Sequence, residues 1–294
     1  NRLSIGLQSA NDEELRILGR IHTYEEFLEC YQMAREEGFQ NINVDIMTAL
    51  PGQTLDSLKD TLCKLIELHP EHISAYSLIL EEGTPFFEKY ANPDGKGVEI
   101  KDNSSKELYE EEKNKEVYIT NTKDKMRLPG EEEERAMYAL VRDTLEAAGY
   151  RQYEISNFAL PGYESRHNTS YWKRISYLGF GLGASSFIGD RRFRNTEDLD
   201  TYLKNGKTKD CFVENIPISE KDAMEETMFL GLRMTEGVDK KAFRKTFGAD
   251  IDTVYNKEIK KLLADGLIEN GEERIRLSRR GVDYGNYVFS RFLL

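Results

Sequence analysis

The chain has 294 residues, of which 39% are apolar and 32% charged, a composition typical of folded domains and unlike that of disordered or fibrous proteins. Lysine and arginine number 41 against 53 for aspartate and glutamate, so the net charge of -12 disfavours general attraction to nucleic acid or to an anionic membrane. No apolar run approaches the roughly 18 residues that a membrane-spanning helix needs. We therefore expect no nucleic-acid partner and no integral membrane segment.

The spacing of the cysteines indicates the cellular compartment, and the first residues indicate where in a domain the chain begins. Cys30, Cys63 and Cys211 lie too far apart for a disulfide framework, a zinc ribbon or a closely spaced cluster. We expect reduced thiols in a cytoplasmic protein. The first eight residues alternate in polarity like a strand and contain neither an initiator methionine nor a signal-peptide pattern. The chain is expected to begin inside a domain.

Strands and helices alternate over the first 90 residues. Apolar patterns predict strands over residues 3–7, 42–47 and 72–80. Two helices lie between them, the first starting at a capping box formed by Thr23 and Glu26. Strands joined by helices of this length require crossover connections and therefore a parallel sheet, either open or barrel-like.

The middle of the chain changes character twice. Residues 91–130 are polar, with few apolar positions, and predict a solvated insertion. Earlier in the chain, a polar turn is expected at 9–22, between the first strand and the first helix. Helical spacing returns around Met137, and residues 152–158 predict a further strand.

The pattern of three helices and a hairpin in the last part of the chain, from residue 211, predicts a winged helix. Asn270 and Gly271 lie between short apolar runs and predict a two-residue hairpin turn. Winged helices often bind DNA, but residues 250–294 hold eight basic and eight acidic residues, which cancel and leave no basic stripe. The predicted helices cover residues 219–234, 239–247, 251–265 and 280–292.

Three polar residues fall on or near the carboxyl ends of the first two predicted strands, where parallel α/β proteins bind ligands. Gln8 closes the first strand, Asp45 lies within the second, and Arg20 lies in the turn between them. A carboxylate inside an apolar strand is costly unless it is paired or bound to a ligand. The pattern alone favours an ion pair between Asp45 and Arg20, and it favours a plain helix entry for residues 50–54.

Five stretches are distinctive when taken together: RLSIGLQS at 2–9, GRIHT at 19–23, NINVDIMTALPGQT at 41–54, HISAYSLILEEGTP at 72–85 and YEISNFALPGYESRHNTSYW at 153–172. In this order they resemble the radical S-adenosylmethionine proteins related to oxygen-independent coproporphyrinogen III oxidase. The resemblance covers nearly the whole chain outside the insertion. HNTSYW at 167–172 is similar to the HNxxYW signature of the haem chaperone branch, HemW, which the coproporphyrinogen dehydrogenases lack.

This resemblance implies an α/β fold, the C-terminal part of a partial (β/α)6 barrel followed by a small winged-helix-like domain. The corresponding domains are residues 1–210, including the insertion, and 211–294. The family binds a 4Fe-4S cluster and S-adenosylmethionine. By position, Gln8 and Asp45 match residues that hold the ribose of S-adenosylmethionine, and Arg20 matches the residue that meets its carboxylate. The resemblance thereby reverses the preference for a structural ion pair.

One feature of the family is missing from this sequence. The cluster motif CxxxCxxC precedes the first strand in the family, and no such motif occurs here. We therefore expect a fragment that binds no 4Fe-4S cluster and is inactive as an enzyme. An open edge on the first strand makes a homodimer through that edge a further expectation.

His167 supplies a haem ligand in this interpretation, with Tyr171 and Trp172 as flat apolar surfaces. A surface histidine beside a core tryptophan is the alternative. Glycines at 179, 181 and 183 form GxGxG, which suits a phosphate cradle only between a strand and a helix and otherwise indicates a close-approach loop at the barrel mouth. Arginines close enough in sequence to meet the haem propionates are Arg166, Arg191, Arg192 and Arg194.

Three functions compete at this point. The first is haem trafficking, in which haem or a porphyrin bound near His167 passes to a client protein. The second is oxygen-independent coproporphyrinogen III oxidase, an enzyme of porphyrin biosynthesis. The third is a DNA-binding regulator, which the charge count opposes. HNTSYW favours the first.

Overall fold

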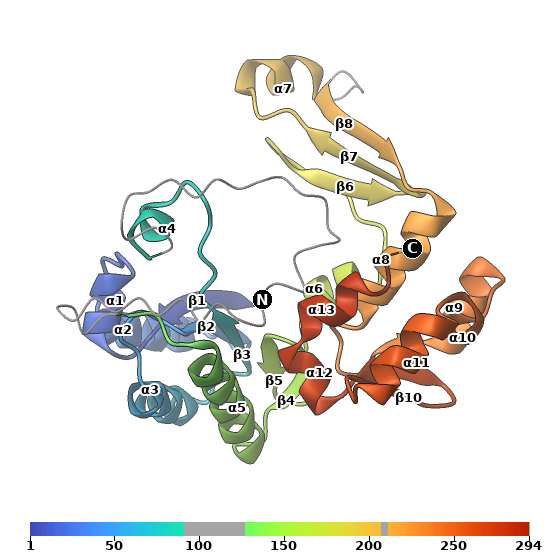
Figure 1. Ribbon diagram of the computed structural model, residues 1–294. Helices are drawn as coiled ribbons and strands as arrows, with labels where there is room; N and C mark the ends of the chain where they lie inside the picture. Colours follow the sequence, from blue (N-terminus) through green and yellow to red (C-terminus); the bar gives the residue numbers. More distant parts are fainter. Residues whose placement is uncertain (91–126, 207–210, 294) are drawn as a thin grey trace. The chain divides into compact units, whose positions relative to one another are not determined.

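The computed structural model describes residues 1–90, 127–206 and 211–293, and it divides into two compact units, Asn1–Gly149 and Tyr150–Leu294 (Figure 1). Most of the predicted polar insertion lies outside the described residues. The domain boundary predicted after residue 210 stays a prediction. Among the described helices, none is long and apolar enough to cross a bilayer.

The first unit contains the predicted parallel sheet. Its strands are β1 (Leu3–Gln8), β2 (Ile42–Thr48) and β3 (His72–Ser77), and β2 lies between the other two. The mixed α/β class with a parallel sheet is confirmed. The last strand stops before the predicted residue 80. The helices of this unit are α1 (Asp12–Ile17), α2 (Tyr24–Glu36), α3 (Leu55–Glu67), α4 (Pro85–Tyr90) and α5 (Glu131–Ala147).

The two faces of this sheet differ in chemistry. Successive strand residues point to opposite faces, so alternate positions form two sets. One set is apolar, and it includes the fully buried Val44, Ile46 and Ile73. The other set is polar, and register pairs Ser4 with Asn43 and Asn43 with His72 on this face. Because α2 contacts β1 and α5 contacts β2 and β3, helices cover the apolar set.

Local capping signals set the starts of the long helices. Thr23 and Glu26 form the predicted capping box of α2, and Thr54 forms a second one with Ser57 at α3. The predicted polar turn after β1 is wrong, because α1 forms there. Its N-cap, Asn11, accepts hydrogen bonds from the backbone of the first helical turn, whose acidic residues suit the helix N-terminus.

The second unit begins with a hairpin where one strand was predicted. β4 (Arg151–Glu154) and β5 (Asn157–Ala159) are antiparallel. The single strand over 152–158 is therefore wrong, because the Glu154 carboxylate accepts from the backbone N–H of Ser156, at 2.8 Å, and from Asn157 and so stabilises a turn. After helix α6 (Arg166–Trp172) comes an antiparallel sheet that the sequence did not predict, β6 (Ser185–Ile188), β7 (Arg191–Asn195) and β8 (Phe212–Pro217), with α7 (Leu199–Asn205) between its last two strands.

The C-terminal part has the helix and strand order of a winged helix. Its core includes the fully buried Met228, Ile275, Val288 and Phe292. The predicted helix 251–265 is interrupted at Tyr255 and the last helix at Tyr284. The elements are α8 (Glu220–Gly231), β9 (Val238–Asp239), α9 (Lys240–Phe247), α10 (Ile251–Val254), α11 (Asn256–Ala264), β10 (Ile268–Asn270), β11 (Arg274–Leu277), α12 (Arg279–Asp283) and α13 (Gly285–Ser290).

The predicted wing hairpin forms, but its turn lies further along the chain. Asn270 pairs with Ile275, and the N–H of Gly271 donates to the carbonyl of Arg274 at 2.9 Å. The two loop residues are therefore 272 and 273, both glutamate, and not Asn270 and Gly271. Asn270 is instead held by Asp252, which accepts from its amide at 2.9 Å.

Candidate functional site

Asp45 lies on the polar face of the first unit's sheet and is held by two neighbours. Asn43 donates to its Oδ1 at 2.7 Å and Ser4 donates to its Oδ2 at 3.0 Å. No ion pair joins Asp45 to Arg20 in the part of the chain that the structure describes, so the structural alternative is not observed. A carboxylate can accept about four hydrogen bonds, and this one is partly exposed. Asp45 therefore keeps acceptor capacity for a hydroxyl-bearing ligand.

Gln8 is turned toward the same face as Asp45. Its φ of 65° is in the left-handed region, which a non-glycine residue adopts at a cost of roughly 1 to 3 kcal/mol. The side chain folds back over Gly6, because a Cβ on Gly6 would lie 2.5 Å from Gln8 Nε2. Gly6 is the register partner of Asp45, so its Cα hydrogen points to the polar face. A strained strand end thus brings Gln8 and Asp45 to one side of the sheet.

Arg20 lies in the loop between α1 and α2 and is exposed. Its backbone N–H donates to the carbonyl of Leu15 at 2.9 Å. Within residues 1–90 and the other described ranges, its guanidinium makes no ion pair. A free guanidinium suits a ligand carboxylate, but no contact ties Arg20 to Gln8 or Asp45.

A buried carboxylate supports the strand-end loops. Glu14 of α1 is 4% exposed and accepts from Ser9 at 2.6 Å, from Gln53 at 3.1 Å and from Ser57 at 2.7 Å. Ser9 follows β1, whereas Gln53 follows β2 and Ser57 lies in the first turn of α3. Charge-assisted hydrogen bonds of this kind are stronger than neutral ones. Glu14 therefore joins the segments that follow β1 and β2.

The described donors and acceptors fit one of the family's cofactors and not the other. Asp45, with spare acceptor capacity beside Gln8, has the chemistry that ribose hydroxyls need. The cysteines do not suit an iron–sulfur cluster, because Cys30 and Cys63 lie on different helices and Cys211 is buried in the second unit. No group of three or more His, Cys, Asp or Glu side chains within the described ranges could hold a metal ion.

His167 lies on α6 in the second unit, with its side chain exposed. Its Nε2 is 3.2 Å from the hydroxyl of Tyr171, one helical turn later, and the two rings meet edge to face at 4.9 Å. Tyr171 in turn contacts the ring of Tyr177 at 4.7 Å. The imidazole is therefore accessible and backed by two aromatic rings.

Trp172 faces the other way and holds α6 in place. It packs against Tyr153, Ala159 and Met234, and the guanidinium of Arg233 lies 4.4 Å from its ring centroid. Its indole Nε1 is buried without a partner among the described atoms. Arg233 also lies 4.0 Å from the buried Glu154, and burial raises the pKa of that carboxyl. In the hexapeptide, Trp172 thus serves packing and His167 faces solvent.

The four arginines proposed for haem propionates differ in availability. Arg192 pairs with Glu226 at 3.1 Å, and Arg194 pairs with Glu197 and Glu214 at 2.6 and 2.8 Å. Arg191 donates to Asn215 at 3.0 Å and Arg166 makes no ion pair within the described ranges. Arg166, the neighbour of His167, is therefore the most available of the four.

The GxGxG segment is not a phosphate cradle. It leads from Tyr177, which bridges to Phe187, into strand β6 and not into a helix. A Cβ on Gly179 would collide with the carbonyl of Ser185, so this glycine is a close-approach position, as predicted. Its placement at the barrel mouth stays a prediction.

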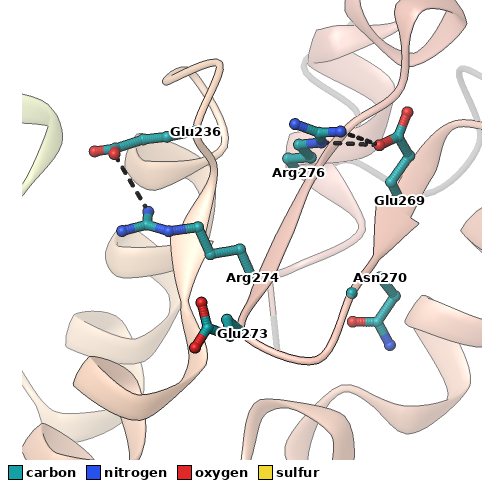
Figure 2. Close-up of a pocket in the computed structure, with 7 residues that line it drawn as sticks. Glu236, Glu269, Asn270, Glu273, Arg274 and Arg276 are labelled. Atoms are coloured by element: carbon teal, nitrogen blue, oxygen red, sulfur yellow. Dashed lines mark hydrogen bonds and ion pairs between the residues drawn. The ribbon is translucent and has the colours of Figure 1, made fainter.

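A concave surface lies beside the wing of the second unit (Figure 2). It is lined by charged side chains that already pair, Arg276 with Glu269 at 2.7 Å and Arg274 with Glu236 at 3.5 Å. No residue of the predicted sites lines it. Its charged walls do not suit a flat apolar ligand.

The polar residues that surround Asp45 were not identified from the sequence alone. Asn43, His72 and Ser74 are all less than 5% exposed, yet they share the polar face with Asp45. A signal was present in the sequence, because polar residues alternate with Ile and Val in NINVDI and with Ile and Ala in HISAYS. Such alternation inside otherwise apolar strands indicates an interior polar face.

Comparisons with known proteins agree with both units. The family model described as "Radical SAM superfamily" matches residues 1–65, and that described as "HemN C-terminal domain" matches residues 218–284. "Heme chaperone HemW" of Bacillus subtilis (strain 168) is 37% identical over 294 residues, which is 100% of this chain and 69% of the relative. The protein of the same name from Lactococcus lactis subsp. lactis (strain IL1403) is 35% identical with the same coverage.

A solved structure shares the fold. It is described as "Coproporphyrinogen III oxidase (HemN) from Escherichia coli is a Radical SAM enzyme", with a TM-score of 0.71 and 21% identity. The match covers 100% of this chain and 64% of that one. At this identity the likeness concerns the fold alone.

Proposed function

The chain belongs to the HemW family of radical S-adenosylmethionine proteins, and we propose that it takes part in haem trafficking by binding haem at His167. As a member of this family it is a haem-related radical S-adenosylmethionine protein. In the proposal haem is cargo, received on α6 and released to a client protein.

The observation that carries the proposal is the exposure of His167 on a helix that is otherwise anchored. A neutral imidazole is a strong ligand for haem iron, and its partner here is a tyrosine hydroxyl that can rotate. Trp172 anchors the helix on the opposite side, so the imidazole is presented by a fixed element. Arg166, one residue earlier, offers a guanidinium for a propionate.

The first unit contributes the proposed S-adenosylmethionine site. Asp45 and Gln8 would hold the ribose, and Arg20 would meet the carboxylate. When bound with a 4Fe-4S cluster, this cofactor supplies radical chemistry in the superfamily. The described residues of this chain contribute recognition of the nucleoside and no cluster ligands.

The strand edge and the cysteines extend the proposal to the assembly and the compartment. An open edge on β1 favours a homodimer, and three free cysteines favour a reducing compartment such as the cytoplasm. Coproporphyrinogen oxidation is not proposed, because the likeness to that enzyme concerns the fold alone. DNA binding is not proposed either, because the winged helix lacks a net positive charge.

Haem titration tests the proposal. Added haem should shift its Soret band with the wild type, and His167→Ala should abolish the shift because the ligand is lost. His69→Asn is the matched control, since it removes another exposed histidine at a positive φ that asparagine tolerates. This control should behave as the wild type. Equal Soret spectra for the wild type and folded His167→Ala would contradict the proposal.

A further inference from the structure

A continuous set of hydrogen bonds leads from His72 to Asp45 across two strands. His72 Nδ1 is 2.5 Å from Asn43 Oδ1, and Ser74 donates to the same oxygen at 3.1 Å. On its other side, the Asn43 amide donates to Asp45 at 2.7 Å and to Ser4 at 2.7 Å. Ser4 then donates to Asp45 at 3.0 Å, which closes the set. All these residues lie on the polar face of the first unit.

The direction of these hydrogen bonds is fixed by chemistry. The Asp45 carboxylate only accepts, so Asn43 must turn its NH2 group toward Asp45. The Asn43 oxygen then faces His72 and Ser74, and both of these must donate. His72 therefore carries its proton on Nδ1. Any other tautomer or amide orientation would set two acceptors against each other.

Burial locks this arrangement. His72 is fully buried and Asn43 is 4% exposed, so a lost partner could not be replaced by bulk water. Burial, with a smaller effect from Arg2, lowers the pKa of His72 to about 3. The ring therefore stays neutral near pH 7, so only one of its two nitrogens carries a proton.

We infer that His72 is a positioning residue which, through Asn43, fixes the Asp45 carboxylate for the two ribose hydroxyls of an adenosyl ligand. The inference rests on the proposed role of Asp45 in the preceding section. Both Asp45 oxygens are held by donors on the sheet side, which leaves their remaining lone pairs directed away from these donors. A carboxylate fixed in this way can accept from both hydroxyls of a cis diol without first reorganising.

The tautomer is tested without any ligand. In protein labelled with 15N-histidine, the ring nitrogens of His72 should show a protonated Nδ1 at pH 7, with the signal assigned by its loss in His72→Asn. A protonated Nε2 with an unprotonated Nδ1 would overturn the inference, whatever the chain binds.

Positioning is tested with two nucleosides, adenosine and 2′,3′-dideoxyadenosine, whose Kd values are measured by NMR titration of the full chain. The wild type should prefer adenosine by about tenfold, as expected for one or two hydrogen bonds to a charged group. His72→Leu should lose most of this preference. His72→Asn, which puts an N–H donor in place of Nδ1, should retain it.

Ile73→Ala is the matched control for stability. Ile73 is fully buried on the opposite face of the same strand. Its truncation therefore weakens the fold but leaves the hydrogen bonds from His72 to Asp45 in place. The preference should survive in Ile73→Ala. If His72→Leu does not fold, His72→Phe, which keeps a ring but has no N–H donor, replaces it, and its preference should fall.

The outcomes separate the two proposals. Equal Kd values for both nucleosides in the wild type would contradict the adenosyl site itself and the inference with it. A wild-type preference that persists in His72→Leu, or in His72→Phe when that variant is needed, would overturn the inference and leave the adenosyl site standing. Equal losses in His72→Leu and Ile73→Ala would show a structural role only and would also overturn it.

Discussion

Two histidines, one in each unit, show how differently the same side chain is used. His72 is fully buried, with a partner that fixes its tautomer, whereas His167 is exposed beside a single hydroxyl. A buried ring with fixed hydrogen bonds can orient its neighbours but cannot reach a ligand. An exposed ring on an anchored helix can bind a ligand but orients little. Accessibility, more than residue type, thus separates the positioning role from the binding role.

At neutral pH, the largest loss of stability from a single substitution is expected at the centre of the polar face. Asn43→Leu removes the acceptor of two buried donors and one donor of Asp45, so it should lower the free energy of unfolding by about 3 kcal/mol. Urea denaturation measures this loss. The matched substitution on helix α6, Asn168→Leu, should lower the free energy of unfolding by less than about 0.5 kcal/mol. Similar losses in the two variants would contradict the comparison.

Substitution of Trp172 on helix α6 should have the next largest effect on stability. Trp172→Ala should lower the free energy of unfolding by about 2 kcal/mol, less than for a fully buried tryptophan because the ring is only partly buried. The Soret shift with haem should remain, since His167 is unchanged. Denaturation and haem titration of the same sample check both expectations. A lost Soret shift in a folded Trp172→Ala protein would show that the indole contacts haem.

The buried histidine should make stability depend on pH. The pKa of His72 is about 3 in the folded chain against 6.5 as the ordinary value, so the unfolded chain binds more protons between these values. The free energy of unfolding should therefore rise with pH through this window, by up to about 1.4 kcal/mol per pH unit from this group, and this contribution is lost as the pH falls toward 3. Urea midpoints from pH 4 to 7 should rise less steeply in His72→Asn. If the urea midpoints of His72→Asn and the wild type rise equally with pH, this pH dependence does not come from His72.

The smallest effect on stability should come from the proposed haem ligand. His167→Ala removes an exposed side chain, so the free energy of unfolding should change by less than about 0.5 kcal/mol. Thermal denaturation of the protein without haem measures this change. A loss above about 1 kcal/mol would mean that the contact with Tyr171 supports the fold.

Elements with local signals could be predicted from the amino-acid sequence. The capping box of Thr23 and Glu26 starts α2, and the spacing of apolar residues predicts the parallel strands. These features depend on residues within a few positions of each other, so they can be read along the chain. The hexapeptide at 167–172 likewise pointed to the haem chaperone family, which the relatives confirm.

The contacts between the polar residues depend on the folded arrangement of the strands. Asn43 contacts Ser4 and His72 because the register of three strands places them side by side, although they are 39 and 29 positions apart in sequence. The positive φ of Gln8 turns its side chain back over Gly6, and no local pattern signals it. Register depends on how the apolar face packs under the helices, since a slip by one residue would exchange the two faces. The pairing of distant strands therefore created the polar set around Asp45, for which the sequence supplied only the alternating residues.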